Sequence, residues 1–221
     1  MMDSLSPNLL LIDKPAGMTS HDVVDRVRRA FKTRKVGHAG TLDPFATGLL
    51  IMGIGPGTKE LTALVGLDKT YIATARLGAT STTEDPEGEI TERASYDVPR
   101  TEELERALNK FRGGYEQTAS AFSAKKIKGK KLYELARRGQ LEGVEIPKKQ
   151  IEISELKILK YDWPRLSFEV SCSSGTYIRA LARDIGEALG CGAYLTELRR
   201  TRIGGFDIKD AKILDSLSPE R

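Results

Sequence analysis

Apolar residues recur along the chain with two spacings, and each spacing predicts a different element. Continuous or alternating apolar runs are typical of strands, whereas apolar residues every three to four positions are typical of amphipathic helices. Strands are therefore predicted at residues 8–13, 49–54, 69–77, 151–158 and 166–172. Helices are predicted at residues 20–32, 101–111 and 173–189. The polar, acidic stretch 81–92 predicts a loop.

Residues at the ends of these segments agree with the assignment. Thr19 or Ser20 is suited to cap the first helix, and Thr58 to cap a short helix that buries Leu61. The turn at 162–164 makes the last two strands a hairpin. Because the strands outnumber those of a strict strand–helix alternation, the pattern predicts a mixed α/β (α+β) fold with much antiparallel sheet.

The composition limits the class of protein. The chain has 221 residues, of which 39% are hydrophobic and 30% charged, and this balance excludes a disordered chain or a membrane protein. Its length fits one domain, residues 1–221, that carries a sizeable insertion. The first residues show no secretory signal, and two cysteines with two histidines are too few for a zinc site without carboxylates. We therefore expect a cytoplasmic protein without a metal.

The positive charge is concentrated in one segment. The chain has 35 Lys and Arg against 31 Asp and Glu, a net charge of +4. Residues 113–150 hold nine of these basic residues and four of the acidic ones, a net charge of +5, so the rest of the chain sums to −1. One interpretation is a solvated lysine face, and the other is a protruding basic element that contacts phosphates.

The loop from Gly37 to Gly48 is the strongest local signal for chemistry. Three of its twelve residues are glycine, which permits tight turns and the close approach of a ligand. Asp43 lies within the loop, immediately before Pro44. A carboxylate on a rigid loop beside an apolar strand is a candidate nucleophile or base. The alternative is an Asp-Pro turn whose carboxylate accepts local backbone hydrogen bonds.

Two further segments are candidate sites. Within 172–179 a strand ends and a helix begins, and free N–H groups at a helix start attract anions. An Arg179 buried there needs an acidic partner, so a structural ion pair is the alternative to a catalytic role. The basic stretch 198–202 is interpreted either as a nucleic-acid contact or as the solvent-facing end of a helix.

Five motifs occur in this order: Lys14-Pro-Ala-Gly-Met-Thr-Ser20, Gly37-His-Ala-Gly-Thr-Leu-Asp-Pro-Phe-Ala-Thr-Gly-Leu-Leu50, Asp68-Lys-Thr-Tyr71, Ser174-Gly-Thr-Tyr-Ile-Arg179 and Leu198-Arg-Arg-Thr201. Together they resemble the bacterial tRNA pseudouridine synthase B (TruB) family, which isomerises uridine 55 in the T loop of tRNA. The resemblance covers about residues 8–206. It implies the pseudouridine synthase fold, a mixed and mostly antiparallel sheet flanked by helices, with the active site in a cleft.

The resemblance also implies a role for each matching residue. Asp43 would be the catalytic aspartate, Tyr71 would stack on the target base and assist proton removal, and Arg179 would pair with Asp43. Substrate contacts are implied for His38 beside the flipped nucleotide, Tyr177 and Leu198 in the uracil pocket, and Lys14 and Pro15 as braces of the catalytic loop. Residues 113–150 correspond to the RNA-gripping insertion, with backbone contacts expected from Lys125, Lys126, Lys128 and Lys130. The resemblance implies no cofactor. We expect a monomer that binds the tRNA T stem-loop without an obligatory protein partner.

The chemistry agrees with these roles. The base must leave the loop stack, which costs a few kcal/mol, and aromatic stacking returns about 1–3 kcal/mol. Asp43 must be ionised to act as a nucleophile, and a cation at Arg179 favours the charged form. The sequence leaves open whether the carboxylate attacks C6 of the base or C1′ of the ribose.

Two departures from the family pattern concern RNA binding. The family's Gln-x-Pro-Pro-x-Tyr-Ser-Ala-x-Lys is here Gln117-Thr-Ala-Ser-Ala-Phe-Ser-Ala-Lys-Lys126, which removes two rigid prolines and one hydroxyl. Only about fifteen residues follow Phe206, so we expect this chain to lack the C-terminal RNA-binding domain that many members carry. We therefore expect the insertion to hold the tRNA.

Two other functions remain open. The altered insertion is consistent with an RNA-binding or tRNA-folding protein with little catalysis. The shared motifs are also consistent with a synthase for another RNA, such as the guide-dependent dyskerin-like relatives. The complete set of Asp43, Tyr71 and Arg179 favours the tRNA enzyme over a pure binding protein, because binding alone needs no nucleophile.

Overall fold

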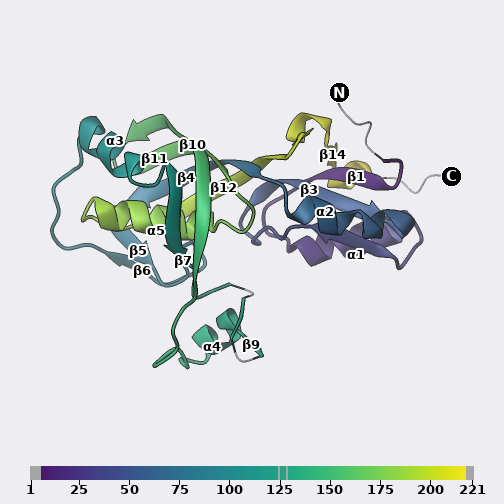
Figure 1. The fold of residues 1–221 in the computed structure, drawn as a ribbon, viewed down its shortest axis with the longest axis horizontal. Coiled ribbons are helices and arrows are strands. Elements are labelled where there is room, and N and C mark those ends of the chain that lie inside the picture. Colours follow the sequence, from purple (N-terminus) through teal and green to yellow (C-terminus); the bar gives the residue numbers. More distant parts are fainter. Residues whose placement is uncertain (1–5, 124, 128, 218–221) are drawn as a thin grey trace. The chain divides into compact units, whose positions relative to one another are not determined.

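The computed structural model describes residues 6–123, 125–127 and 129–217. These residues form two compact units. Unit 1 contains the described residues within 1–72, 169–174 and 197–221, and unit 2 those within 73–168 and 175–196. Ten of the strands in the described ranges belong to one mixed sheet (Figure 1). Three of them run through both units, namely β4 (Lys69–Leu77), β11 (Arg165–Cys172) and β12 (Ala193–Ile203). The description as one catalytic domain over 1–221 stays a prediction.

Unit 1 is built around β3 (Thr47–Ile54), which pairs antiparallel with β1 (Leu9–Lys14) and with β2 (Val36–Ala39). β3 also pairs parallel with β12, through Arg199 and Arg200. The remaining pairings of this unit are β1 with β14 (Lys212–Ile213), which is parallel, and β12 with β13 (Phe206–Asp207), which is antiparallel. Most of these pairings are antiparallel, as the pattern of apolar residues predicts.

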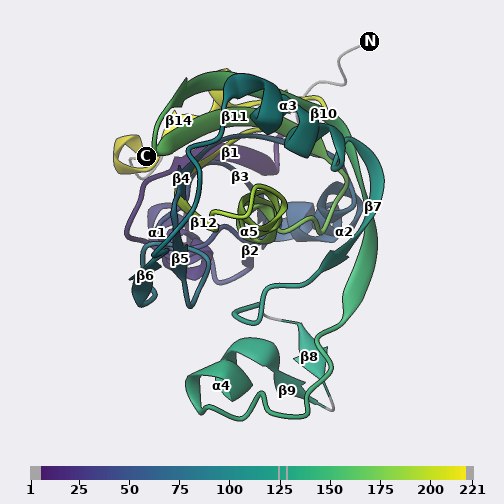
Figure 2. The same cartoon turned by 90° about the vertical axis from the view of Figure 1, so that its left-hand side faces the viewer.

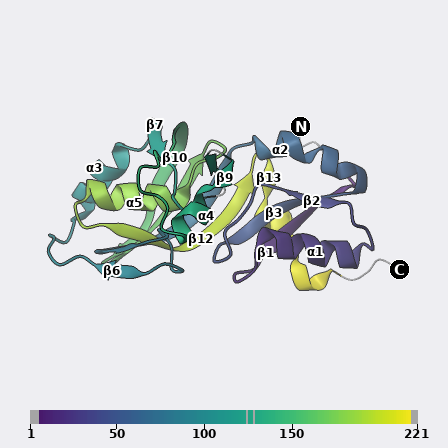
Figure 3. The same ribbon diagram turned by 90° about the horizontal axis from the view of Figure 1, so that it is seen from below.

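Helices cover both faces of these strands, as Figure 3 shows for α1 (Ser20–Ala30) and α2 (Leu61–Val65). On one face, α1 contributes Val23 and Val27 to a buried core with alternate residues of β1 and β3. On the other face, Leu61 of α2 packs with the intervening residues of the same strands. Successive side chains of a strand point to opposite faces, so strands buried on both faces have continuous apolar runs.

Unit 2 contains the pairing of β10 (Lys148–Asp162) with β7 (Gly113–Thr118), which is antiparallel. Its longer helices are α3 (Thr101–Asn109) and α5 (Ile178–Ala188), and both are amphipathic. α5 buries its apolar side completely, including Leu181 and Ile185. Two short strands, β5 (Ala79–Ser81) and β6 (Ile90–Glu92), form a hairpin beside them.

The basic insertion projects from the paired ends of β7 and β10 (Figure 2). Ala119 N donates to Pro147 O at 3.1 Å and closes its neck. The described residues of the insertion form three short elements, β8 (Lys126–Ile127), β9 (Lys130–Lys131) and α4 (Leu132–Arg137). The insertion therefore has a small hydrogen-bonded structure of its own, in which β8 pairs with β9.

The structure corrects four details of the sequence interpretation. The stretch 81–92 contains strand β6 and is not only a loop. Thr58 caps no helix, because its hydroxyl donates to Gly55 O within a short 3₁₀ helix that precedes α2. The helix expected from residue 173 begins at Ile178. The stretch 198–202 is not a helix end, because it lies within strand β12.

Candidate active site

Asp43 lies in the loop 40–46, which joins β2 to β3. The Ser20 hydroxyl anchors this loop to the first turn of α1, since it accepts from Leu42 N (2.9 Å) and donates to Leu42 O (3.2 Å). On the other side of Asp43, Ala46 N donates to Asp43 O at 3.1 Å. Gly40 begins the loop at φ +85°, where a side chain would strain the backbone. The half-buried Asp43 side chain is thus presented by a backbone fixed on both sides.

Lys14, at the end of β1, is completely buried. Its ammonium group donates to three backbone carbonyls, those of Pro15 (2.9 Å), Met18 (2.6 Å) and Pro44 (3.3 Å). The last of these carbonyls belongs to the Asp43 loop, and the charge of Asp43 acts on the same ammonium group. Lys14 and the Pro15 carbonyl therefore make the contacts that bracing of the loop requires, while their catalytic importance stays a prediction.

Lys14 should give the protein a measurable pH dependence. Burial lowers the pKa of Lys14 from 10.5 to about 8, although the charge of Asp43 opposes this shift. The unfolded chain then binds more protons between those two values, so the contribution of Lys14 to the free energy of unfolding rises with pH in that window. This rise in the free energy of unfolding is at most about 1.4 kcal/mol per pH unit. We expect it to be absent from Lys14→Met. Urea unfolding of both proteins across this window measures it, and parallel pH curves would contradict the shift.

Arg200 is a second buried cation beside the loop, with only 1% of its surface exposed. Its guanidinium donates to Leu49 O (2.8 Å), Gly40 O (3.0 Å) and Thr41 O (3.4 Å). It also hydrogen-bonds to the Tyr71 side chain. One side chain therefore joins the start of the Asp43 loop, strand β3 and Tyr71.

Sequence reasoning missed Arg200, although the sequence contains a signal for it. The basic character of the stretch 198–202 predicts a nucleic-acid contact or a solvent-facing helix end, and neither interpretation places an arginine in the core. Strand periodicity places Arg199 and Arg200 on opposite faces. Arg199 pairs with Asp13 (2.6 Å) at a partly exposed position, whereas Arg200 points into the core.

Tyr71, on β4, is buried with 6% of its surface exposed. Burial raises the pKa of its phenol, and the Arg200 guanidinium partly opposes the rise. The charge of Asp43 acts in the same direction as burial. The phenol is therefore neutral at physiological pH and offers both an aromatic face and a hydroxyl proton.

His38 and Leu198 complete the predicted site residues of unit 1. His38 lies on β2 opposite Met52 and is half-buried. Burial lowers the pKa of His38, as does the nearby charge of Arg200, which favours the neutral imidazole. Leu198 is buried on β12, and its carbonyl accepts from the Thr47 hydroxyl at 3.5 Å.

Tyr177 and Arg179 lie at the start of α5, in unit 2. Arg179 is buried and forms a salt bridge with Asp85 at 2.9 Å. It also donates to Thr83 O (2.9 Å) and to Phe122 O (3.2 Å). Asp85, from the acidic turn between β5 and β6, is an acidic partner of the kind that a buried arginine needs, and sequence reasoning did not name it. The pairing of Arg179 with Asp43, which belongs to unit 1, stays a prediction.

The four lysines expected to contact the RNA backbone are only partly described. Lys130 is exposed on β9, and Lys125 is half-buried beside β8. Lys126 belongs to β8, and its side chain lies outside the described structure, as does the whole of Lys128. Their role stays a prediction.

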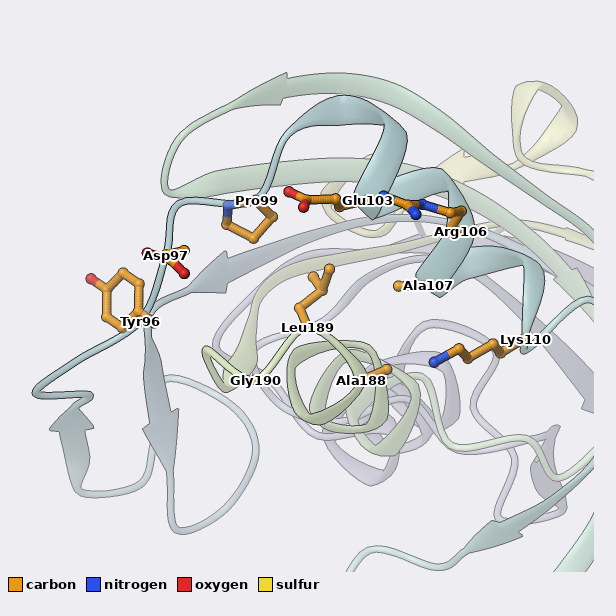
Figure 4. Close-up of a pocket in the computed structure, with 10 residues that line it drawn as sticks. All are labelled: Tyr96, Asp97, Pro99, Glu103, Arg106, Ala107, Lys110, Ala188, Leu189 and Gly190. Carbon is orange, nitrogen blue, oxygen red and sulfur yellow. The ribbon is translucent and has the colours of Figure 1, made fainter.

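A cavity of about 560 Å³ lies in unit 2 between α3 and the end of α5 (Figure 4). Tyr96 and Asp97 line one side of it, and the charged side chains of Glu103, Arg106 and Lys110 come from α3 or its end. None of the predicted site residues lines this cavity. Its mixed charges select no particular ligand, so we assign it no role.

Two general features of the described residues concern membranes and metals. None of the helices there is both long and apolar enough to span a bilayer. Within the same ranges, no group of three or more His, Cys, Asp or Glu side chains is arranged to hold a metal ion.

Solved structures share this fold. A Cbf5-Nop10-Gar1 complex matches with a TM-score of 0.73 and 29% identity, over 94% of this chain and 52% of the matched chain. An H/ACA RNP bound to a substrate RNA containing 2'-deoxyuridine matches with a TM-score of 0.70 and 27% identity, over 94% of this chain and 51% of the other. This chain therefore spans about half the length of these two.

Family comparisons agree with the fold. A model of the TruB family pseudouridylate synthases (N terminal domain) matches residues 28–178, and one of the tRNA pseudouridylate synthase B C-terminal domain matches residues 179–219. The fold and the motifs together define a pseudouridine synthase, which is a kind of isomerase. The predicted fold class is confirmed.

Curated relatives narrow the assignment. The tRNA pseudouridine synthase B of Mycobacterium leprae (strain TN) is 48% identical, over 97% of this chain and 69% of its own length. That of Mycobacterium tuberculosis (strain CDC 1551 / Oshkosh) is 47% identical, over 98% of this chain and 74% of its own. The chain belongs to the TruB family of pseudouridylate synthases.

Proposed function

We propose that this enzyme converts uridine 55 in the T loop of tRNA to pseudouridine, with Asp43 as the nucleophile. Membership of the family and relatives named tRNA pseudouridine synthase B support tRNA as the substrate. One observation carries the assignment of Asp43: its loop is held by two buried cations, Lys14 and Arg200. Positive charge near a carboxylate favours its ionised form, which a nucleophile requires.

The proposed reaction is an isomerisation in which no atoms are lost. Uridine 55 first flips out of the loop stack, so that its glycosidic bond becomes accessible. Asp43 attacks either C6 of the base or C1′ of the ribose, and the bond between N1 and C1′ breaks. The uracil rotates and C5 forms the new bond to C1′. The bond between Asp43 and the substrate then breaks and frees the carboxylate, and the proton from C5 is lost while N1 gains one. Holding the free uracil requires a pocket that excludes water.

The other predicted residues have separate tasks in this proposal. Tyr71 stacks on the base and assists removal of the C5 proton, for which its neutral phenol is suited. His38 occupies space beside the flipped nucleotide, and Tyr177 and Leu198 line the uracil pocket. Arg179 supplies positive charge for the reacting carboxylate. The cytoplasm is the proposed compartment, because tRNA is the proposed substrate, and we propose a monomer.

A T stem-loop RNA tests this function directly. We expect the enzyme to form pseudouridine in a stem-loop that carries uridine at position 55 and to form none when cytidine replaces it. Binding of the RNA without pseudouridine would instead identify an RNA-binding protein. The resemblance to a Cbf5-Nop10-Gar1 complex favours, as a second candidate, a synthase that needs protein or RNA partners. Activity of the purified chain on the stem-loop alone would exclude that candidate.

The insertion should supply much of the tRNA affinity. Each phosphate neutralised by a lysine releases counterions, so binding weakens with salt in proportion to the number of contacts. Replacing Lys125, Lys126, Lys128 and Lys130 by alanine is expected to weaken binding and to reduce the slope of log affinity against log salt by up to about 3. Filter binding over a range of salt concentrations measures the slope. An unchanged slope would show that these lysines form a solvated surface and do not contact phosphates.

A further inference from the structure

Gln117 is a buried polar residue at the neck of the insertion. It lies on β7 opposite Lys149 of β10, and only 1% of its surface is exposed. Its amide Nε2 donates to Tyr177 O (3.0 Å) and to the Tyr115 hydroxyl (2.7 Å). Its Oε1 accepts from Tyr177 N at 2.9 Å. The Gln117 carboxamide thus binds both backbone polar groups of a single residue, Tyr177.

Tyr177 occupies the position at which α5 begins. It is the N-cap residue, with φ −93° and ψ 107°, and its side chain caps no helical N–H group. Its carbonyl also accepts the helical hydrogen bond from Leu181 N (3.0 Å). These backbone angles restrict the rotamers that the Tyr177 ring can adopt. Gln117 hydrogen-bonds to both the N–H and the C=O group of the same residue.

Two arginines of α5 bind the same part of the insertion. Arg183 donates to Thr118 O at 3.1 Å, and Arg179 donates to Phe122 O at 3.2 Å. The strand that leads into the insertion is therefore tied to the first two turns of α5 at positions 117, 118 and 122. These hydrogen bonds connect the strand directly to the start of α5.

We propose that Gln117 is a positioning residue that couples engagement of RNA by the insertion to the orientation of Tyr177. The inference rests on the proposed function, in which the insertion grips tRNA and Tyr177 lines the uracil pocket. A carboxamide presents a donor and an acceptor side by side, as the N–H and C=O groups of Tyr177 require. Leucine offers neither group, and ionised glutamate offers only acceptors.

Steady-state and single-turnover kinetics on tRNA test this role. We expect Gln117→Leu to lower kcat and the single-turnover rate about 10- to 100-fold, as expected for a misplaced substrate contact. The KM for tRNA should stay within about threefold, because the insertion itself is unchanged. The matched control is Gln140→Leu, since Gln140 is an exposed glutamine of the same insertion and should have no effect.

Gln117→Glu gives a readout that a structural role alone would not produce. The ionised carboxylate cannot donate to Tyr177 O, whereas its protonated form can. Activity relative to the wild type should therefore rise as the pH is lowered. The charged or titratable groups around this position are Tyr115 of β7, Lys149 of β10, and Arg183 and Asp184 of α5. All of these groups are also present in the wild type. The ratio of the Gln117→Glu activity to the wild-type activity therefore reports the titration of the new carboxyl group.

The outcomes separate this inference from the proposed function. A wild-type enzyme that forms no pseudouridine at position 55 would refute the proposed function. With an active wild type, two results would overturn the coupling role: an unchanged kcat in Gln117→Leu, or a loss confined to KM. If Gln117→Leu does not fold, Gln117→Glu serves as the test. A ratio of Gln117→Glu activity to wild-type activity that is independent of pH would then overturn the coupling role of Gln117.

Discussion

Asp43→Asn should abolish pseudouridine formation while the protein remains folded. We expect kcat to fall about 10⁴-fold or more, as expected when an enzyme loses its nucleophile. The side chains of Asp and Asn have nearly the same shape, but the amide cannot act as a nucleophile. The Asp43 loop is held through the backbone atoms of Leu42 and Pro44, which the substitution leaves in place.

Kinetics and folding of Asp43→Asn are measured together. The single-turnover rate on a T stem-loop gives the chemical step, and circular dichroism with urea unfolding reports the fold. The matched control is Asp97→Asn, at an exposed position, which should retain full activity. Activity of Asp43→Asn within tenfold of wild type would remove Asp43 from the role of nucleophile.

Arg200→Met should produce the largest loss of stability among single substitutions near the site. It leaves the carbonyls of Gly40, Thr41 and Leu49 without the guanidinium donor. Each buried acceptor left without a partner costs about 1–3 kcal/mol, so we expect a loss of about 3 kcal/mol or more. Activity should fall as well, because the same side chain holds the start of the Asp43 loop and hydrogen-bonds to Tyr71.

Urea unfolding of Arg200→Met at neutral pH measures this loss. Arg202→Met is the control, because Arg202 lies on the same strand but is largely exposed, with a long 3.5 Å contact to Asp207. Exposed ion pairs of this kind contribute about 0–1 kcal/mol. Equal midpoints for Arg200→Met and Arg202→Met would contradict the structural importance of the buried guanidinium.

The apolar pattern predicted most of unit 1 because packing there follows simple periodicity. The runs at 9–12 and 49–52 become strands that are buried on both faces. Residues 20–30 become the helix that covers one face of these strands. Thr19 caps this helix as predicted, because its hydroxyl accepts from Asp22 N. Strand β12 was missed, since three arginines between 199 and 202 obscure its alternation.

Other features depend on contacts between distant parts of the chain. The sequence shows that a buried Arg179 needs an acidic partner, but Asp85 lies 94 residues away in a turn rich in acidic residues. Nothing in the local pattern of 82–89 separates Asp85 from its neighbours. The burial of Lys14 is equally hidden, because a lysine at a strand end is normally exposed. In this chain three carbonyls from two loops satisfy its ammonium group.

Position-resolved detection of pseudouridine tests the central claim most directly. A tRNA transcript without modifications is incubated with the purified wild-type protein or with Asp43→Asn, and pseudouridine is mapped at every uridine. The proposed function predicts pseudouridine at position 55 with the wild type alone. Absence of pseudouridine from that position with a folded wild-type protein, or its formation there by Asp43→Asn at the wild-type rate, would contradict it.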